Sequence, residues 1–156
     1  MNYKLLLCLF VVLLICCNKN ESKFIGIWNI KTRMPYSAKL TLNENHTFSY
    51  KGGACLSLFE SNGNWKIVND TLILKSKLPN ECFHTSKFGY ICYEIKDSLK
   101  IRSQTTIPNC KPKNVGFDFI NFQDDKFILK NDSLVYLIDK YDNCADDNNK
   151  FLISRK

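Results

Sequence analysis

From Phe24 onward, apolar and polar residues alternate along much of the chain with a period of two, which is the pattern of half-buried β-strands. The apolar stretches are rich in aromatic and β-branched residues, which fit the pleated surface of a sheet. After residue 24, no stretch of about ten residues shows the 3.6-residue period of an amphipathic helix. The sequence therefore predicts an all-β fold.

Short polar turns join several of the expected strands into hairpins. The first hairpin has strands at 39–43 and 47–51, joined by a turn at 44–46. Three further hairpins share one design, in which an aromatic-led strand is followed by a turn ending in Asp-Ser or Asp-Thr and by a strand that opens with Leu. They cover residues 65–74, 93–101 and 127–136. Asn and Asp tolerate left-handed backbone, so they suit tight turns of this kind.

Successive local hairpins favour an antiparallel up-and-down meander that forms a closed or partly open β-barrel. Residues 108–114, with two prolines, are expected to form a loop, as are residues 142–149. A last strand is expected at 151–154. We see no domain boundary, so residues 24–156 are expected to form a single β-barrel domain.

The first 16 residues have the pattern of an export signal. Lys4 precedes an unbroken apolar run over residues 5–15, and an abruptly polar stretch begins at Asn18. The run fits the apolar region of a signal peptide and is shorter than the roughly 20 residues that cross a membrane as a helix. We expect residues 1–16 to be a signal peptide and residues 17–23 to be a short tether.

Residues 14–17 read Leu-Ile-Cys-Cys and resemble the lipobox of bacterial lipoproteins. The resemblance implies that Cys17 becomes the N-terminus after cleavage and carries the acyl chains, palmitate among them. Families with this motif usually place Gly, Ala or Ser before the lipidated residue, where this chain has Cys16. Acyl chains contribute about 0.8 kcal/mol per buried CH₂, so two or three give stable anchoring. The alternative is a secreted protein in which Cys17 is a free or disulfide-bonded cysteine.

The residue after Cys17 bears on the destination of such a lipoprotein. In lipoprotein families, Asp in this place tends to retain the protein at the inner membrane, and here the residue is Asn18. The resemblance therefore implies an outer-membrane lipoprotein that faces either the periplasm or the cell surface. Glu21 is a reduced form of the acidic signal that some Bacteroides and Flavobacterium relatives use for surface export.

The first strands also resemble a known family. Residues 26–28 read Gly-Ile-Trp, and the patterns at 40–50 and 63–72 follow them. Together, over residues 24–75, they resemble the lipocalin-like envelope lipoproteins of Bacteroides and Flavobacterium relatives. That resemblance implies a β-barrel, usually of unassigned function, with ligand binding inferred by analogy. It also implies that Trp28 closes one barrel end beneath a basic side chain from the last strand, for which Arg155 is the candidate.

The positive net charge indicates a different kind of partner when the protein is exported. The chain has 22 Lys and Arg against 15 Asp and Glu. Lys4 is the one charged residue of the expected signal peptide, so the processed chain has a formal charge of +6. Export makes nucleic acid an unexpected partner, and no stretch combines clustered Lys and Arg with interleaved aromatics. We expect the membrane, reached through Cys17, to be the first partner.

Cysteines are the next candidates for chemistry. Of the 8 Cys, Cys8 and Cys16 leave with the signal peptide and Cys17 takes lipid, and the remaining five are disulfide candidates in an oxidising envelope. These are Cys55, Cys82, Cys92, Cys110 and Cys144. Their pairing stays open, with one thiol left over. The alternative is metal ligation around Cys82, His84 and Cys92, but the C-x₂₋₄-C pair that marks zinc sites is missing, so we expect no metal.

Two tryptophans are candidate ligand-binding residues. Trp28 and Trp65 are large and aromatic, as the lining of ligand pockets usually is, and the alternative is that both belong to the core. His46 and His84 lie in no catalytic motif, and no Gly-x-Ser-x-Gly elbow is present. The acidic loop 142–149 has Asp where an EF-hand calcium loop needs Gly. No catalytic residue and no cofactor is assigned, and we expect that the protein is not an enzyme.

The three repeated turns carry one further candidate modification. Thr71, Ser98 and Ser133 each follow Asp and precede Leu. This sequence resembles the O-glycosylation sites of Bacteroides-type envelope proteins. The alternative is a plain hairpin turn followed by an apolar strand residue.

Together these features predict a membrane-anchored, non-enzymatic envelope lipoprotein whose barrel binds a small apolar or amphipathic ligand. The alternative is a protein-interaction module with a solid core, such as an envelope inhibitor or an assembly subunit. A charge of +6 suits an acidic protein partner. The two functions differ in whether the barrel encloses an apolar cavity of about 300 Å³ or more.

Overall fold

The computed structural model describes residues 21–31, 36–54, 56–88, 104–114, 116–137 and 152–155. These residues form strands, turns and loops, and none of them lies in a helix. None of these segments therefore offers a helix that is long and apolar enough to cross a membrane. The expected signal peptide, residues 1–16, lies outside the described residues, and so does Cys17.

The described residues contain ten strands that form one sheet. Their bounds are β1 Gly26–Lys31, β2 Tyr36–Leu42, β3 Thr47–Ala54, β4 Ser57–Val68, β5 Thr71–Ser76, β6 His84–Ser86, β7 Phe117–Ile120, β8 Gln123–Lys130, β9 Ser133–Leu137 and β10 Leu152–Arg155. The loop expected at 108–114 contains no strand, and the last strand is present as β10.

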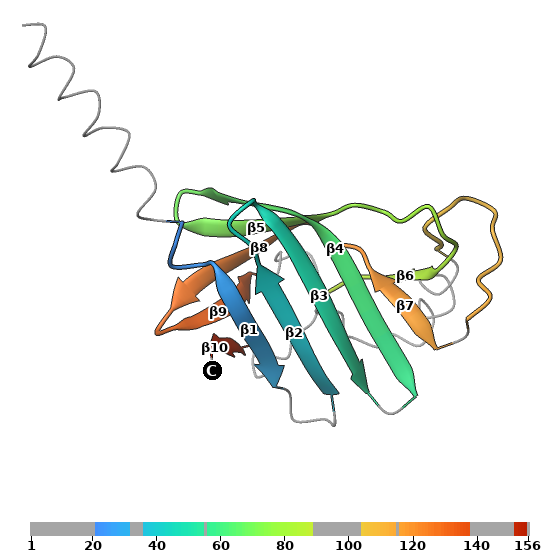
Figure 1. The fold of residues 1–156 in the computed structure, drawn as a ribbon, viewed down its shortest axis with the longest axis horizontal. Helices are drawn as coiled ribbons and strands as arrows, with labels where there is room; N and C mark the ends of the chain where they lie inside the picture. Colours follow the sequence, from blue (N-terminus) through green and yellow to red (C-terminus); the bar gives the residue numbers. More distant parts are fainter. Residues whose placement is uncertain are drawn as a thin grey trace, which may run out of the picture.

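Eight of the strands close into an antiparallel barrel (Figure 1). The order around it is β1, β2, β3, β4, β5, β8, β9 and β10, and β10 returns to β1 through the pairs Trp28↔Arg155 and Ile30↔Ile153. Each barrel strand is antiparallel to both neighbours in the barrel. The predicted fold class, an all-β up-and-down barrel, is confirmed.

The up-and-down course separates the barrel into two ends. The turns at 43–46, 69–70 and 131–132 lie at one end, together with the start of β1 and the last residue of β10. We call this the turn end. The end of β5 and the start of β8 lie at the other end, together with the described residues between these two strands, which include β6 and β7 and which we call the insert. We call this end the insert end (Figure 1).

The tight turns at the turn end form as the sequence predicts. Asn69 and Asp70 join β4 to β5 with φ values of 49° and 58°, and Asn131 and Asp132 join β8 to β9 with 48° and 56°. Two successive residues with positive φ define the turn that matches the twist of a hairpin, and Asn and Asp adopt this backbone at low cost. The third hairpin of the same design, residues 93–101, lies outside the described residues.

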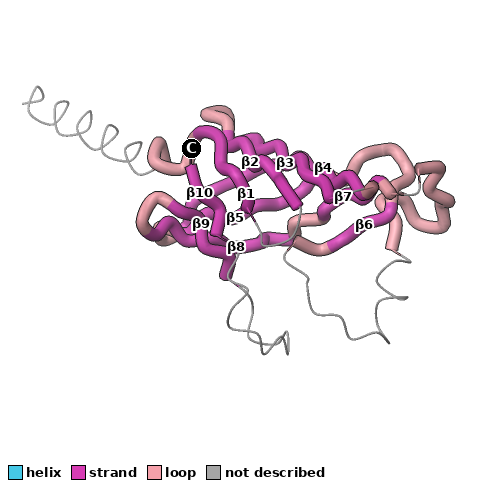
Figure 2. The backbone as a smooth tube through the Cα atoms, turned by 90° about the horizontal axis from the view of Figure 1, so that it is seen from below, coloured by secondary structure: helices cyan, strands magenta, loops and turns pink. Residues whose placement is uncertain are grey.

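The insert end contains two strands that the sequence did not predict. β7 pairs in parallel with the first part of β4, and β6 pairs in parallel with β7. Figure 2 shows β6 and β7 extending to one side of the barrel strands. Parallel pairing needs a long connection and leaves no local turn pattern, so the alternation of residues could not reveal it.

A network of hydroxyl groups holds the insert against the barrel where β5 leaves β4. The hydroxyl of Ser76 contacts that of Ser61 at 2.7 Å and donates to the carbonyl of Ile120 at 3.2 Å. It also accepts from the amide of Phe122 at 2.9 Å. Close approach of β5 to β4 here depends on Gly63, because a Cβ atom there would lie 2.1 Å from the carbonyl oxygen of Lys75.

Candidate functional site

Trp28, one of the two candidate ligand-binding residues, lies in the core at the turn end. Its side chain is 0% exposed, and its indole N–H donates to the carbonyl of Phe24 at 2.7 Å. The guanidinium of Arg155 lies 4.6 Å from the ring, within the range of a cation–π contact. The structure thus brings together the two residues that the resemblance paired.

Trp65 is also buried at the turn end. Its indole N–H donates to the carbonyl of Asn43 at 3.0 Å, and the ring of His46 lies against it with 4.7 Å between centroids. The indole N–H is the single donor of a tryptophan side chain, and in both residues it binds a backbone carbonyl. Both tryptophans act as packing residues in this arrangement.

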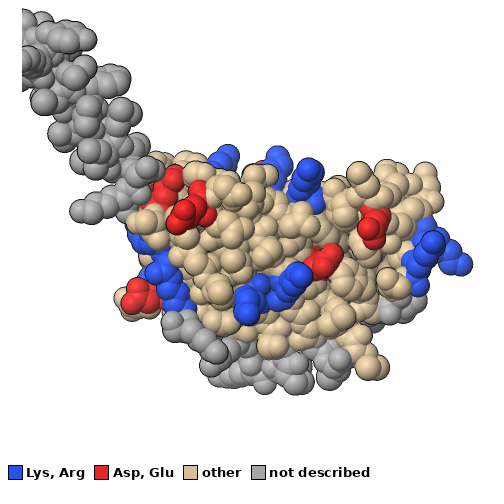
Figure 3. Space-filling view, viewed as in Figure 1, with Lys and Arg blue, Asp and Glu red and all other residues tan. Residues whose placement is uncertain are grey.

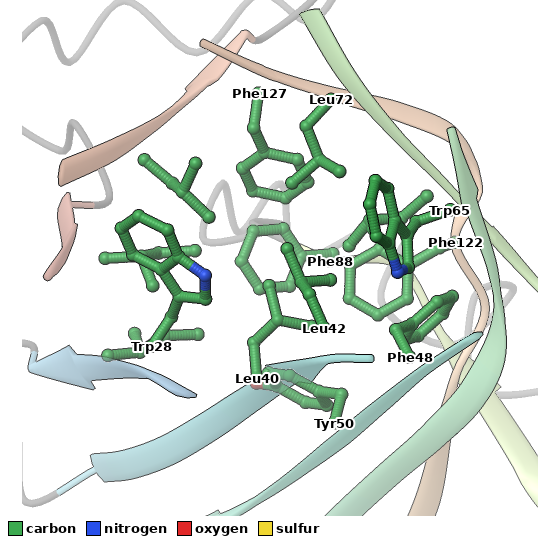
Figure 4. Packing of buried hydrophobic residues seen from close by; sticks show 14 of the residues in the cluster. Trp28, Leu40, Leu42, Phe48, Tyr50, Trp65, Leu72, Phe88, Phe122 and Phe127 are labelled. Carbon is green, nitrogen blue, oxygen red and sulfur yellow. The ribbon is translucent and has the colours of Figure 1, made fainter. Parts of the chain in front are cut away.

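The described side chains that point into the barrel pack against one another. One contiguous cluster takes buried residues from all eight barrel strands, and Figure 4 shows side chains of this cluster pointing toward one another around Phe88. Its members on these strands are Trp28, Ile30, Ala38, Leu40, Leu42, Phe48, Tyr50, Trp65, Leu72, Leu74, Phe127, Leu134 and Ile153. Barrels of eight strands are wide enough to be filled by their own side chains or to hold one small ligand, and in the described part of this barrel the inward side chains form one packed cluster.

Aromatic residues from the insert close the lumen at the insert end. Phe88 follows β6 and lies 5.1 Å from Phe122, 5.5 Å from Phe127 and 5.2 Å from Tyr136, measured between ring centroids. Phe122 precedes β8 and meets Tyr50 at 5.7 Å with nearly perpendicular planes. Such edge-to-face contacts add to the burial of apolar area, so the insert serves as the floor of the core.

Asp125 is the titratable residue that the structure places at this floor. The hydroxyl of Tyr136 donates to one carboxylate oxygen at 2.7 Å, and the amide of Gln123 donates to the other at 2.7 Å. Burial raises the pKa of Asp125 above its ordinary value of 3.8, while these hydrogen bonds and the charge of Lys87 oppose that rise. Both oxygens are engaged by the protein, which suits a structural carboxylate.

The residues with catalytic chemistry do not form a nucleophile and base pair in the described part of the chain. His84, Ser86 and Asp118 share one face of the β6–β7 pair. Ser86 donates to Asp118 at 2.9 Å, and the Nδ1 atom of His84 is buried without a partner. His46 contacts Glu21 instead, with 3.0 Å between Nε2 and Oε2. A hydrolytic triad places the histidine between the nucleophile and the acid, whereas here the serine, Ser86, bonds directly to the aspartate, Asp118.

The side chains that could bind a metal ion are also dispersed in the described part of the chain. Among the described residues, no group of three or more His, Cys, Asp or Glu could hold a metal ion. Cys92 and the acidic loop 142–149 lie outside the described residues.

A shallow depression of about 230 Å³ lies over the outer side of β4 and β5, where the ammonium of Lys75 is 4.0 Å from Asp124. Both charged groups are exposed, so they do not form an enclosed site.

A disulfide bond, which the sequence predicts, is present among the described residues. Cys82 and Cys110 form a disulfide with 6.0 Å between their Cα atoms. Beside it, residues 104–106 run along β6, where the amide of Thr85 donates to Gln104 and that of Thr106 donates to Phe83. Cys55, Cys92 and Cys144 lie outside the described residues.

The predicted glycosylation residues lie at the turn end. Thr71 opens β5 and Ser133 opens β9, and each hydroxyl points back to its own turn, at 3.4 Å from the carbonyl of Asn69 and 3.5 Å from that of Asn131. Both side chains are partly exposed. Ser98 lies outside the described residues, and glycosylation stays a prediction.

Sequence reasoning missed an apolar surface at the insert end. Leu56, just before β4, is 94% exposed, and Leu58, on the outer side of β4, is 57% exposed. Leu58 is paired with Phe117 of β7, whose ring lies 5.0 Å from that of Phe83. We call Leu56, Leu58, Phe83 and Phe117 the outer patch. Its signal in the sequence was that Leu58 and Phe59 are both apolar, so this strand has no fully polar face.

Basic side chains border the outer patch. Figure 3 shows a group of them at the end of the molecule that carries β6 and β7. Lys111 and Lys113 are exposed in the loop that follows the disulfide, and Lys51 is exposed on β3, two residues before the strand position that faces Leu58. Glu60 is paired with Lys51 on the same side of the sheet, so the patch is apolar in its middle and has a border that is basic on balance.

Comparison with known proteins gives no relative: no family model, no curated protein and no solved structure matches this chain.

Proposed function

We propose that this chain is a non-enzymatic lipoprotein of the bacterial envelope, anchored through Cys17, whose solid barrel is a protein-interaction module. The packing of the described inward side chains into one cluster is the observation that supports this proposal. All eight barrel strands contribute side chains to one core cluster, and Phe88 and Phe122 of the insert close it. A ligand pocket of ordinary size needs about 300 Å³ or more of space, so recognition is assigned to the outer surface.

The outer patch is the surface that suits a protein partner. Apolar side chains exposed together are typical of interfaces, in which an apolar centre is surrounded by a polar border. Leu56 and Leu58 supply the centre, and Lys51, Lys111 and Lys113 supply a basic border. The partner is then an envelope protein whose contact surface is apolar with acidic residues around it, since opposite charges favour encounter.

The anchor is tested separately from the binding surface. Protein purified from a lipoprotein-processing bacterium is expected to have lost residues 1–16 and to carry acyl chains on Cys17, as read from intact mass. The Cys17→Ser variant is expected to leave the membrane fraction. An unmodified Cys17 in membrane-free protein contradicts the anchor and leaves the binding surface to be judged by itself.

The binding surface is tested with a photo-crosslinking residue placed at Leu58 or at Ile27. Both residues are exposed and apolar, with Ile27 on β1 near the turn end, so Ile27 is a matched control. We expect one acidic envelope protein to be captured from position 58 and not from position 27. Equal capture from both positions contradicts the assignment of the patch.

The captured protein then allows a measurement of affinity. We expect Leu58→Lys to weaken binding about tenfold or more, as loss of a central apolar contact does, and Ile27→Lys to leave it unchanged. Native mass spectrometry with fatty acids tests the ligand-binding alternative. A stoichiometric complex that forms only with the folded barrel overturns the proposal in favour of a lumen that opens for ligand.

A further inference from the structure

The segment that leads into the barrel is bonded to the turn end. The carboxylate of Glu21 lies 3.0 Å from the imidazole of His46, in the turn between β2 and β3. The ammonium of Lys23 lies 2.9 Å from the carboxylate of Asp70, in the turn between β4 and β5. We call residues 21–25 the N-terminal clasp. Residues 21–23, expected to belong to the tether, are thus part of the barrel's end.

Buried contacts hold the clasp more firmly than these exposed side-chain contacts. Phe24 is 0% exposed within the core cluster, and its carbonyl accepts the indole N–H of Trp28 at 2.7 Å. Arg155, the last residue of β10, donates to the carbonyls of Lys23 and Ile25 at 2.5 and 2.8 Å. The clasp is therefore tied to the first strand, to the last strand and to two turns.

We infer that the membrane lies at the turn end of the barrel and that the outer patch faces away from it. This inference rests on the proposed anchor at Cys17. Only four residue steps separate Cys17 from Glu21, and an extended chain spans about 14 Å over four steps. The acyl-bearing residue therefore stays within about 14 Å of the place where the clasp is bonded.

The distance along the barrel is larger than this reach. β4 has 12 residues and runs from the insert end to the turn end. At about 3.3 Å per residue and a tilt of about 40°, it rises about 30 Å along the barrel axis. Leu56 precedes β4 at the insert end, whereas Asp70 follows it at the turn end. With the barrel axis upright on the bilayer, the short tether therefore keeps the turn end near the head groups and the insert end about 30 Å farther away.

The side chains of the turns suit contact with lipid head groups. Asn43, Glu44, Asn45, Asn69 and Asp70 are exposed in the turns and all are polar, whereas the exposed apolar side chains nearby, Ile27 and Val68, lie on strands. Such side chains hydrogen-bond to phosphate and ammonium groups and have no tendency to enter hydrocarbon. The membrane partner is thus a surface of zwitterionic phospholipid head groups, on which the barrel rests without insertion.

The test compares two positions of one fluorescent residue in the lipidated protein. It is placed at Glu44 or at Leu56, which are both exposed but lie at opposite ends. The proteins are bound to phosphatidylethanolamine–phosphatidylcholine vesicles that contain a lipid with a nitroxide quencher on its head group. Because the ends differ by about 30 Å, we expect quenching at position 44 to exceed that at position 56 at least twofold. Equal quenching, or stronger quenching at position 56, overturns the inference.

A matched variant separates the short reach from other causes of orientation. A flexible linker of about 20 Gly and Ser residues inserted between Asn20 and Glu21 keeps the anchor and the clasp but extends the reach, so the quenching difference should collapse. A difference that persists shows that something other than the short tether orients the barrel, which contradicts the inference. Vesicle flotation separates the two proposals. A wild-type protein that does not float fails as an anchored protein and removes this inference with it, whereas one that floats with equal quenching fails only in orientation.

Discussion

The two ends of the barrel are built by different kinds of interaction. At the turn end, the structure includes hairpin turns that residues close in sequence make: the pairs Asn69-Asp70 and Asn131-Asp132 turn the chain with positive φ, and Arg155 adds a bond to Ile25, 130 residues away. At the insert end, residues far apart in sequence make it: β4 pairs with β7, and Cys82 bonds to Cys110. Local interactions cost little loop entropy, whereas distant ones need cross-links and buried hydrogen bonds to offset it.

The difference suggests a division of roles. The turn end joins the clasp, Trp28 and Arg155 into one bonded unit, which suits the fixed side of an anchored protein. The insert end exposes Leu56 and Leu58 over a framework that the disulfide holds. Substitutions at each end should therefore have separable effects.

Trp28→Ala should damage the turn end most. The side chain is fully buried, supports Arg155 and donates to Phe24, so its loss leaves a cavity and an unpaired carbonyl. We expect the free energy of unfolding to fall by about 3–5 kcal/mol in urea titration. Leu56→Ala, at an exposed position, is the control and should change it by less than about 0.5 kcal/mol. Similar values for both would show that the turn end is not part of a cooperative core.

The double variant Cys82→Ser with Cys110→Ser should damage the insert end selectively. The disulfide closes a separation of 28 residues, and its removal is expected to cost about 3 kcal/mol. Hydrogen exchange should speed up in β6 and β7 while β8 and β9 stay protected near their turn. Uniform acceleration through both ends would contradict the separation of the two regions.

Ser76→Ala should weaken the connection between the two regions. It leaves Ser61, the amide of Phe122 and the carbonyl of Ile120 without their shared partner. Loss of a buried hydroxyl network of this kind is expected to cost about 1–3 kcal/mol, measured by urea titration. Ser133→Ala is the control, because that hydroxyl makes a long hydrogen bond of 3.5 Å to the carbonyl of Asn131 and the residue is partly exposed. Equal losses of unfolding free energy in the two variants would show that the hydroxyl network stabilises the fold no more than the partly exposed hydroxyl of Ser133 does.

These three predictions also show what the sequence contained. Alternation and the Asn-Asp pairs revealed the barrel strands and the turns at the turn end, because both signals are local. The resemblance revealed the pairing of Trp28 with Arg155. Neither revealed the bond between Cys82 and Cys110, since five cysteines allow many pairings, nor the role of Phe88 as a floor, since an aromatic residue after a short strand has no distinctive pattern. The outer patch was missed because exposure depends on which neighbours cover a strand.

Asp125 makes the stability of the insert end depend on pH. Its pKa is raised by burial in the folded protein, so the folded state holds the proton more tightly than the unfolded chain does. The contribution of this group to stability is therefore full below pH 3.8 and is lost as pH rises through its folded pKa. Asp125→Asn should remove this part of the pH dependence, as measured by thermal melting from pH 3 to pH 7.

The phenol of Tyr136 provides the control for this titration. Its hydrogen bond to Asp125 lowers the pKa of that carboxyl, so Tyr136→Phe should raise the pKa further and shift the loss of stability to higher pH. An unchanged profile in both variants would show that Asp125 is hydrated in solution and does not belong to the floor of the core.

Asp132→Gly should strengthen the turn end by a small amount. Asp132 holds a φ of 56° between Asn131 and the first residue of β9, and glycine adopts this backbone without the steric cost of a Cβ atom. Asn-Gly is also the pair most favoured in two-residue hairpin turns, so we expect a gain of about 0.5–1 kcal/mol in urea titration. Asp132→Ala keeps the Cβ atom without the local hydrogen bonds of Asp, so it should lower stability by a similar amount. If Gly and Ala gave the same change, the turn would not be what fixes the register of β8 and β9, and the rule that local sequence builds the turn end would fail at this hairpin.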